Sequence, residues 1–395
     1  METLEQQLVL AKENFYAHFM QTPLAVAYAP GRINIIGEHT DYNQGLSMPG
    51  AINRWITVAI APRTDKEIHI VSKEFDGEIK FNWSDTYQPK VSWEEYVYGC
   101  LLLFHKVAPF NEGFNAVISG NVPIGSGVSS SAALEVAFMN ALNHLAKKPL
   151  DKLTLIRLCQ QVEHQYLNVK SGLLDQYASQ FSVSGQVMVL DFLTISHTYI
   201  TADTKGYVWV LCDSKVQRTL AGSKYSERVQ ETQQGLLHLQ QLYPEIKNFR
   251  DIEEKHLTAL DDFTQKKRIR HYLSENKRVQ DAVKALAAKK IDKFGTLITS
   301  SHLSLRDDYE VSCPALDFLV EQAIATNVCI GSRMMGGGFG GCTINLVKED
   351  EVESFSKKVK EAYFKRFQVE TEINVYQSVD GAGVFSVMKN GQYTS

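Results

Sequence analysis

What this chain can fold into is limited most by the run from residue 30 to residue 45, which reads Pro-Gly-Arg-Ile-Asn-Ile-Ile-Gly-Glu-His-Thr-Asp-Tyr-Asn-Gln-Gly. Three isoleucines in this run require a hydrophobic core. Among them stand four side chains that cannot enter a core without a partner: Arg32, Glu38, His39 and Asp41. Such a run lies at the edge of a core and lines a polar pocket. Because carboxylates accept hydrogen bonds and imidazole donates or accepts them, the run predicts a site for a ligand with several hydroxyl groups.

The composition is typical of a soluble globular protein. The chain has 395 residues, enough for two domains, and 44% of them are hydrophobic and 22% charged. A net charge of −4 implies no bulk attraction to nucleic acid or to an anionic membrane. Residues 1–10 are polar, which argues against a signal peptide, and no apolar run approaches the length of a membrane span. The six scattered cysteines include no Cys-x-x-Cys pair and predict reduced, buried thiols in a cytoplasmic protein.

Hydrophobic periodicity predicts a mixture of strands and helices. Helices are expected over 5–18, 93–104, 132–145, 153–167, 313–325 and 349–367, and the region 223–297 is mostly helical. Strands are expected over 24–28, 52–60, 67–72, 114–119, 186–192, 207–212, 343–347, 372–376 and 382–387, the first of them running into a turn at Pro30-Gly31. Since strands and helices do not alternate regularly, the pattern favours an α+β fold. A division into domains 1–195 and 196–395 is expected, although no linker marks it.

A glycine- and serine-rich loop, 123–133, stands between a predicted strand and a predicted helix. Gly125 and Gly127 can adopt positive φ and let the backbone approach a ligand closely. Three consecutive serines, Ser129, Ser130 and Ser131, lie at the start of the helix, where free N–H groups favour a phosphate. The loop is neither a Walker A loop nor a dinucleotide fingerprint. A capped helix after a flexible turn is an equally good interpretation of the loop alone.

A second pair of carboxylates follows the loop. Glu163 lies in the next helix, and Asp175 is flanked by leucines and a tyrosine, so Asp175 needs a partner, for which Arg32 is suitable. A helix cap for Asp175 and a solvated helix face for Glu163 remain open. The segment 331–342, with six glycines, is either a tight turn or a ligand contact, and the acidic residues of 304–312 either cap a helix or face the site.

Taken together, the motifs resemble those of galactokinases in the GHMP kinase family. Residues 30–43 resemble the galactokinase sugar signature, 123–133 the phosphate loop of the family, 331–342 its third, glycine-rich motif, and 304–312 another galactokinase segment. The resemblance spans nearly the whole chain. It implies a two-domain fold with the active site in the cleft between the domains. It also implies transfer of the γ-phosphoryl group of ATP to the C1 hydroxyl of α-D-galactose, which makes galactose 1-phosphate in the Leloir pathway.

The resemblance also assigns residues to roles. Asp175 matches the catalytic aspartate, and Arg32 matches the arginine that pairs with it. The sugar ligands that it implies are Glu38, His39, Thr40, Asp41 and Tyr225. It places ATP against Ser72 and against the triphosphate loop formed by Gly125, Ser126, Gly127, Val128, Ser129, Ser130 and Ser131. Mg²⁺ would be held by Ser131 and Glu163. A cytoplasmic monomer that binds neither nucleic acid nor membrane is expected.

Two segments depart from the family pattern. Around the aspartate the family reads Cys-Gly-Ile-Met-Asp-Gln-Phe, whereas residues 171–177 read Ser-Gly-Leu-Leu-Asp-Gln-Tyr. Near Tyr225 the segments 216–218 and 225–229 also differ from the pattern. A kinase for another sugar, such as N-acetylgalactosamine or an arabinose-like pentose, is therefore an alternative. A non-catalytic sugar sensor is a weaker one, because 129–133 is uninterrupted and Arg32, Asp175, Ser131 and Glu163 are all present.

Overall fold

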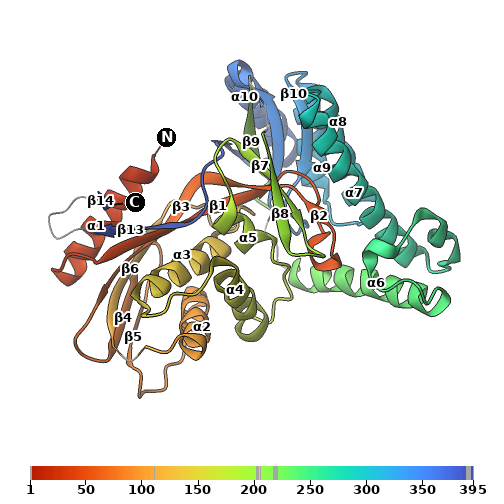
Figure 1. Cartoon of the computed structure of the whole chain (residues 1–395). Coiled ribbons are helices and arrows are strands. Elements are labelled where there is room, and N and C mark those ends of the chain that lie inside the picture. The colour runs from red at the N-terminus through yellow and green to blue at the C-terminus, as the bar shows by residue number, and fades with distance from the viewer. Residues whose placement is uncertain are drawn as a thin grey trace.

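A seven-stranded sheet forms the first half of the molecule (Figure 1). The computed structural model describes residues 2–110, 112–201, 204, 206–216, 221–387 and 393–394. Within these residues the strand order is β14 (Tyr393–Thr394), β13 (Gly383–Val387), β1 (Ala25–Asn34), β3 (Pro49–Pro62), β6 (Phe114–Gly120), β4 (Glu67–Ser72) and β5 (Glu78–Asn82). Neighbours in the sheet are antiparallel except β4 and β6, which are parallel.

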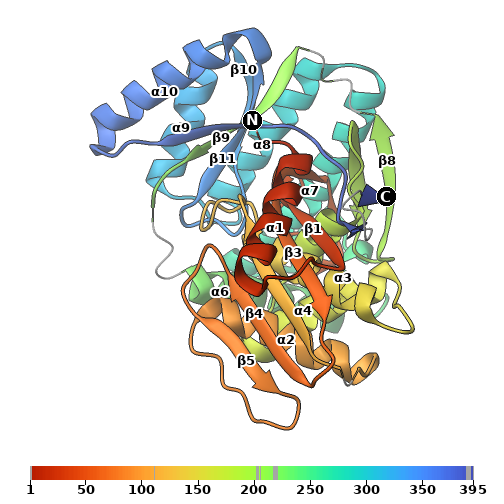
Figure 2. The ribbon, with the colours of Figure 1, turned by 90° about the vertical axis from the view of Figure 1, so that its left-hand side faces the viewer.

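Helices cover both faces of this sheet. On one face lies α1 (Leu4–Phe19), whose Leu8, Ala11 and Phe15 pack on Val26 and Val117 (Figure 2). On the other face lie α2 (Ser92–Val107), α3 (Ser130–Leu145), α4 (Lys152–Tyr166) and α5 (Leu174–Phe181). Every residue of α3 from Ala132 to Leu142 is buried, because this helix contacts the sheet and also α2, α4 and α5. The core beneath the glycine-serine loop is therefore rigid.

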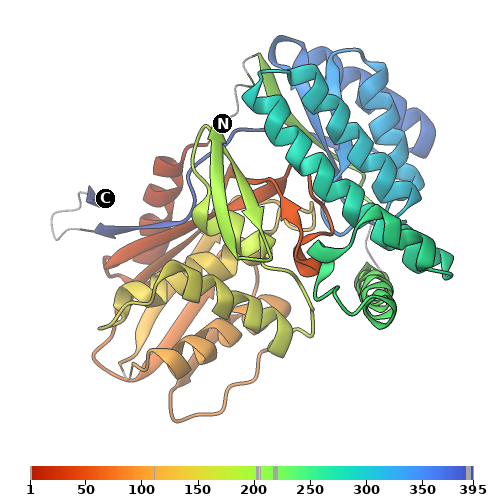
Figure 3. The same cartoon turned by 45° about the vertical axis from the view of Figure 1, so that its right-hand side comes forward.

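The second half is built on a four-stranded sheet with the order β10 (Cys329–Met334), β11 (Cys342–Lys348), β9 (Tyr207–Asp213) and β12 (Glu372–Tyr376). It packs with α8 (Ile291–Asp307), α9 (Pro314–Ala325) and α10 (Val352–Phe367) (Figure 3). A small third sheet contains β2 (Leu46–Ser47), β7 (Gln186–Asp191) and β8 (Ser196–Thr201). The remaining elements are the long helices α6 (Ala221–Leu242) and α7 (Phe263–Ala287) and the short turns η1 (Asp41–Asn43), η2 (Phe249–Asp251), η3 (Glu254–Ala259) and η4 (Glu349–Glu351).

The expected α+β class and most of the expected elements are confirmed, and the bounds of β4 and β12 are those predicted. The predicted turn at Pro30-Gly31 is wrong. Strand β1 continues through it to Asn34, with a register shift between Pro30 and Arg32. A bulge of this kind tolerates proline and changes the direction of the side chains that follow. Strands β2, β5, β8, β10 and β14 and the short helix α5 were not predicted.

The division into domains 1–195 and 196–395 stays a prediction, and strand pairing crosses this boundary. The antiparallel pair β7–β8 spans residue 195, and β13 returns from the end of the chain to pair with β1. None of the six cysteines, all of them among the described residues, forms a disulfide, and five of them are buried, as expected of structural thiols. Among the described helices, none has the length and apolar character that crossing a membrane requires.

Candidate active site

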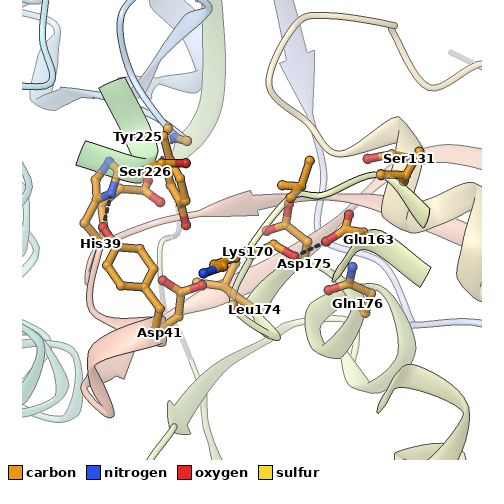
Figure 4. A pocket seen from close by; sticks show the side chains of 18 of the residues that line it. His39, Asp41, Ser131, Glu163, Lys170, Leu174, Asp175, Gln176, Tyr225 and Ser226 are labelled. Carbon is orange, nitrogen blue, oxygen red and sulfur yellow. Dashed lines mark hydrogen bonds between the residues drawn. The ribbon is translucent and has the colours of Figure 1, made fainter. Parts of the chain in front are cut away.

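A cavity of about 540 Å³ brings the first motif, the segment before α5 and the glycine-rich third motif together (Figure 4). It is lined by polar side chains from distant parts of the sequence, which include Arg32, Glu38, His39, Asp41, Ser131, Glu163, Lys170, Asp175 and Tyr225. Most of the residues predicted to bind sugar or metal therefore line one space. Thr40 is not among the described residues that line it.

Arg32 and Asp175 form the ion pair that the sequence predicts. Arg32 Nε donates to Asp175 Oδ1 and Nη2 donates to Oδ2, each at 2.7 Å, and Nη1 donates to the carbonyl of Gly127 at 2.7 Å. Burial opposes the charge of Arg32, but the carboxylate of Asp175 outweighs it, and the pKa of Arg32 is raised. The hydroxyl of Ser129 also donates to Asp175. A bidentate pair of this kind fixes both the position and the orientation of the carboxylate.

The glycine-serine loop adopts the conformation that its glycines predict. Gly125 and Gly127 both have φ of +78°, and Ser129 has φ of +57°. Helix α3 begins at Ser130, and no side chain caps its N-terminus, because the hydroxyl of Ser129 bonds to Asp175 instead. The free N–H groups of the first turn are thus available to an anion. Capping by the serines, the alternative interpretation, does not occur.

Val128 and Ser126 connect the glycine-serine loop to its surroundings. Val128 is fully buried in the core, and its carbonyl accepts the N–H of Arg32 at 3.0 Å, so only its backbone faces the loop. Ser126 donates to the carboxylate of Asp213 at 3.2 Å, which ties the loop to the end of β9 in the second sheet.

A second cavity of about 340 Å³ adjoins the first. The two cavities share Tyr96 and Ser131 in their linings, and the second is otherwise mostly apolar, with Ile56, Phe75, Trp93, Ile118, Val122, Ile124 and Leu134. Ser72 lies in its wall, where its hydroxyl accepts the N–H groups of Glu74 and Phe75 at 3.3 and 3.2 Å. An apolar cavity beside a loop that favours phosphate suits a flat heteroaromatic ring carrying phosphate groups.

Glu163 is buried, so the alternative interpretation, in which it lies on a solvated helix face, is wrong. Burial raises its pKa to about 7. The bond donated by Ser171 opposes this shift, and the negative charge of Asp175 adds to it. Carboxylate and hydroxyl oxygens are the ligands that Mg²⁺ prefers, and Ser131 lines the same cavity. A cation beside Glu163 would lower that pKa, so the donor set fits a magnesium ion.

Along the opposite wall lie His39, Asp41 and Tyr225, which point into the space beside Asp175 (Figure 4). His39 has φ of +60°, and its Nδ1 bonds to the hydroxyl of Tyr42 at 2.7 Å. Its Nε2 is buried and has no hydrogen-bond partner among the described residues. Burial lowers the pKa of His39 to about 3, so its ring is neutral at pH 7. Burial, followed by the charges of Asp175 and Glu38, raises the pKa of Asp41 to about 7.

Glu38 joins the first motif to the third. Its carboxylate accepts bonds from Arg333 Nη2 at 2.9 Å, from the N–H of Gly336 at 3.0 Å and from Asn34 Nδ2 at 3.2 Å. Arg333 is fully buried and also donates to the carbonyl groups of Asn34, Ile35 and Met334. The glycine-rich segment 331–342 is therefore both a structural support for Glu38 and, at Gly336–Gly338, a wall of the cavity.

Thr40 is placed differently from the expectation. Its buried hydroxyl bonds to the carbonyl groups of Gly37 and Leu46, at 2.9 and 2.8 Å, and stabilises the loop between β1 and β2. A short side chain that bonds its own loop points away from the ligand space. Thr40 shapes the wall without lining the cavity.

Two further residues of the site, Glu275 and Lys170, were not predicted from the sequence. Glu275, fully buried on α7, accepts the N–H groups of Gly37 and Glu38 at 2.9 and 3.3 Å and pairs with Arg278 at 2.6 Å. Lys170 lines the cavity beside Asp41 (Figure 4). Glu275 is one of many charged residues on α7, so the local sequence does not indicate that it is buried. Lys170 directly precedes segment 171–177, where the sequence departs from the family pattern, and this position is a signal that it lies near the site.

Other expectations are resolved by the contacts. In segment 304–312, Asp308 pairs with Arg270, and Glu310 pairs with Arg268 and Lys267, so these acids bind α7 and neither cap a following helix nor line the cavity. Tyr177 stands where the family pattern has phenylalanine. Its side chain points away from the cavity, because its hydroxyl bonds to His197 Nδ1 at 2.7 Å. The departures at 217–218 lie outside the described residues.

Three family models match segments of this chain. Models described as the N-terminal and C-terminal domains of GHMP kinases match residues 95–183 and 282–365, and a galactokinase galactose-binding signature matches residues 13–62. Solved mevalonate kinases share the fold, one of them with a TM-score of 0.63 and 18% identity over 90% of this chain and 99% of its own. The architecture is thus that of a GHMP kinase.

Relatives with higher sequence identity identify the family within the GHMP kinases. A galactokinase of Roseiflexus sp. is 37% identical over 96% of this chain and 97% of its own length, and one of Exiguobacterium sibiricum is 38% identical over 91% and 92%. The crystal structure of Lactococcus lactis galactokinase complexed with galactose superposes with a TM-score of 0.89 and 34% identity, over 95% of this chain and 99% of that one. The chain belongs to the galactokinase family.

Proposed function

We propose that this protein transfers the γ-phosphoryl group of ATP to the C1 hydroxyl of α-D-galactose. The observation that carries the proposal is the Arg32–Asp175 pair, which stands between two binding regions. On one side lies the uncapped N-terminus of α3 beside an apolar cavity. On the other side lies the wall of hydroxyl-binding groups, with the unpaired nitrogen of His39 and the carboxylate of Asp41. Relatives named galactokinase, and one solved with galactose, support the choice of sugar.

Phosphoryl transfer depends on alignment and on charge stabilisation more than on covalent chemistry. Asp175 accepts a hydrogen bond from the C1 hydroxyl, orients its oxygen and receives its proton. The C1 oxygen bonds to the γ-phosphorus as the bond from that phosphorus to the β,γ-bridging oxygen breaks, and ADP leaves. Arg32 keeps Asp175 ionised and offsets the charge of the transferred group, and the N–H groups of the loop bind the phosphates. Ser131 and Glu163 would hold Mg²⁺, which supplies further charge stabilisation when bound. His39 and Asp41 bind other hydroxyl groups of the sugar.

The assignment of galactose is tested with a panel of sugars. Purified protein with Mg²⁺ and ATP should release ADP when galactose is added, and kcat/KM should be lower for N-acetylgalactosamine and for arabinose. A much higher kcat/KM for either of those sugars would overturn the preference for galactose. Absence of ADP release with every sugar, together with galactose binding by calorimetry, would instead indicate a non-catalytic sensor.

Substitution of Ser131 by alanine tests the metal site. The variant should require a higher Mg²⁺ concentration for half-maximal rate, because one oxygen ligand is lost and Mg²⁺ keeps a strict ligand geometry. A titration of initial rate against free Mg²⁺ at saturating ATP measures this shift. The control is Ser300→Ala, since Ser300 is partly exposed on α8, outside both cavities, and donates to the carbonyl of Thr296 at 2.8 Å. An identical Mg²⁺ titration for Ser131→Ala and wild type would exclude this serine as a ligand.

Gly172 should determine the position of Asp41. A Cβ atom built on Gly172 would lie 1.7 Å from Asp41 Oδ2 and 2.4 Å from its Cγ, so an alanine displaces the carboxylate. A hydrogen bond to a charged group contributes about 1.5–3 kcal/mol, and we expect the KM for galactose to rise ~10–100-fold in Gly172→Ala. The matched control is Gly50→Ala, where a Cβ would meet no atom within 4 Å. An unchanged KM in Gly172→Ala would mean that Asp41 does not bind the sugar.

A cytoplasmic monomer remains part of the proposal. The cysteines, none of which forms a disulfide in the described part of the chain, are consistent with a reducing compartment.

A further inference from the structure

Three metal-binding side chains converge on the far side of the large sheet. His18 lies in the last turn of α1, His69 lies on β4 and Glu78 lies on β5. One ligand atom from each lies within 4.8 Å of the other two. His69 Nε2 and Glu78 Oε2 are 2.8 Å apart. The α1 face of the sheet is opposite the face that packs on α3, α4 and α5 (Figure 2). The cluster is therefore separate from the proposed active site.

The rings of the cluster are held in place by their neighbours. The His18 and His69 rings meet edge to face, with centroids 5.5 Å apart and planes at 79°. Phe19 packs against both rings, at 4.6 Å from His18 and 5.1 Å from His69. This packing limits the rotamers of both histidines, so part of the entropy cost of assembling a site is already met by the fold.

The charges around the cluster also suit a cation. Glu78 adds a carboxylate, and its Oε2 lies 2.8 Å from His69 Nε2. Two nearby basic residues, Lys73 and Lys80, are exposed, where solvent screens their charges.

We propose that His18, His69 and Glu78 form a binding site for a divalent transition-metal ion, with Zn²⁺ preferred and water as the fourth ligand. Two imidazoles and a carboxylate with one open position are a ligand set that zinc adopts. Bond lengths near 2.0–2.1 Å put the ligand atoms of a tetrahedral site about 3.3 Å apart. The three ligand atoms lie within 4.8 Å of one another, so modest changes in the side-chain torsions of the exposed His18 and Glu78 bring them to that spacing around the packed His69. Mg²⁺ and Ca²⁺ prefer oxygen ligands, so this site should discriminate against them.

A metal ion here would link the end of α1 to β4 and β5. Strand β5 is at the edge of the sheet, and α1 packs mainly on β3 and β6. Zn²⁺ binding would connect α1 to β4 and β5, with which α1 otherwise has few contacts. It would stabilise the folded chain by mass action. The inference does not depend on the proposed phosphoryl transfer.

Calorimetric titration of the metal-free protein with Zn²⁺ tests the proposal, with His18→Ala, His69→Ala and Glu78→Gln as variants. Mutation of a residue that only hydrogen-bonds to a metal ligand typically lowers metal affinity ~10–100-fold. Loss of a histidine ligand itself should therefore weaken Zn²⁺ binding at least ~100-fold. The control is His238→Ala, since His238 lies on α6 outside the cluster and should leave binding unchanged. Thermal denaturation provides a second measurement, because Zn²⁺ should raise the Tm of wild type and of His238→Ala but not of His69→Ala.

The contrary results are equally clear. Equal Zn²⁺ affinity in wild type and in both histidine variants would place any bound zinc elsewhere and overturn the proposal. So would the absence of Zn²⁺ binding to wild type, or binding of Mg²⁺ with the same affinity and the same sensitivity to His69→Ala.

Discussion

Replacing Asp175 with asparagine is expected to lower kcat by about 10²–10⁴, the range typical of a lost acid–base group, while the protein stays folded. Asparagine has the same shape, but its amide presents an N–H group to one of the Arg32 donors that now bond to the carboxylate. The side chain can then neither accept the proton of the C1 hydroxyl nor balance the charge of Arg32. The KM for galactose should change much less than kcat.

Steady-state kinetics with galactose and Mg-ATP measure this effect, and thermal denaturation confirms the fold. Asp307→Asn is the matched control, because Asp307 is exposed at the end of α8 and pairs with its neighbour Arg306 on the surface. That control should keep wild-type turnover. Near-normal turnover in folded Asp175→Asn would remove Asp175 from the chemical step, and the charge stabilisation by Arg32 and the loop would have to account for the rate.

Replacing Arg333 with methionine is expected to lower the free energy of unfolding by about 3–5 kcal/mol, because it leaves the buried carboxylate of Glu38 without its cation. The guanidinium is fully buried and donates to three carbonyl groups as well as to Glu38. Methionine fills a similar volume but satisfies none of these acceptors. Sugar binding should weaken as well, since Glu38 lies in the cavity wall.

Denaturant unfolding of the variant and of wild type measures the difference. The matched control is Arg306→Met, since Arg306 is more exposed and pairs with a neighbour on the surface, where an ion pair contributes about 0–1 kcal/mol. Arg333→Lys should recover only part of the loss, because an ammonium group cannot reach all four acceptors. Unfolding free energies that agree within about 0.5 kcal/mol for wild type and Arg333→Met would show that the buried network contributes little net stability.

Much of the site could be predicted from the sequence because its motifs are local. The glycines of the loop at 123–133 have the positive φ that their placement predicts, and α3 follows directly. The Arg32–Asp175 pair was predicted because a carboxylate among leucines needs a cation, and the two side chains meet at 2.7 Å. The periodicity of apolar residues located most helices and strands, since burial of one face repeats every two or 3.6 residues.

Other features could not be predicted because they depend on packing between distant segments. Strand β1 passes through Pro30-Gly31 since β3 and a bulge accommodate the proline, whereas the dipeptide alone indicates a turn. Strand β10 contains glycine, serine and arginine and lacks a strand pattern, but it is stabilised by pairing with β11. Thr40 has the right residue type for a sugar ligand, and only the loop geometry turns its hydroxyl inward.

The sequence by itself determined the class of chemistry, through an anion-binding loop, a hydroxyl-binding run and a carboxylate that needs a cation. These are properties of short segments, in which neighbouring residues decide the backbone conformation and the available charge. Only the tertiary structure decided which groups face the ligand and which support the wall. Glu275 holds Gly37 across 238 residues, and Arg333 reaches Glu38 across 295, because burial forces each polar group to find a partner wherever the fold brings one.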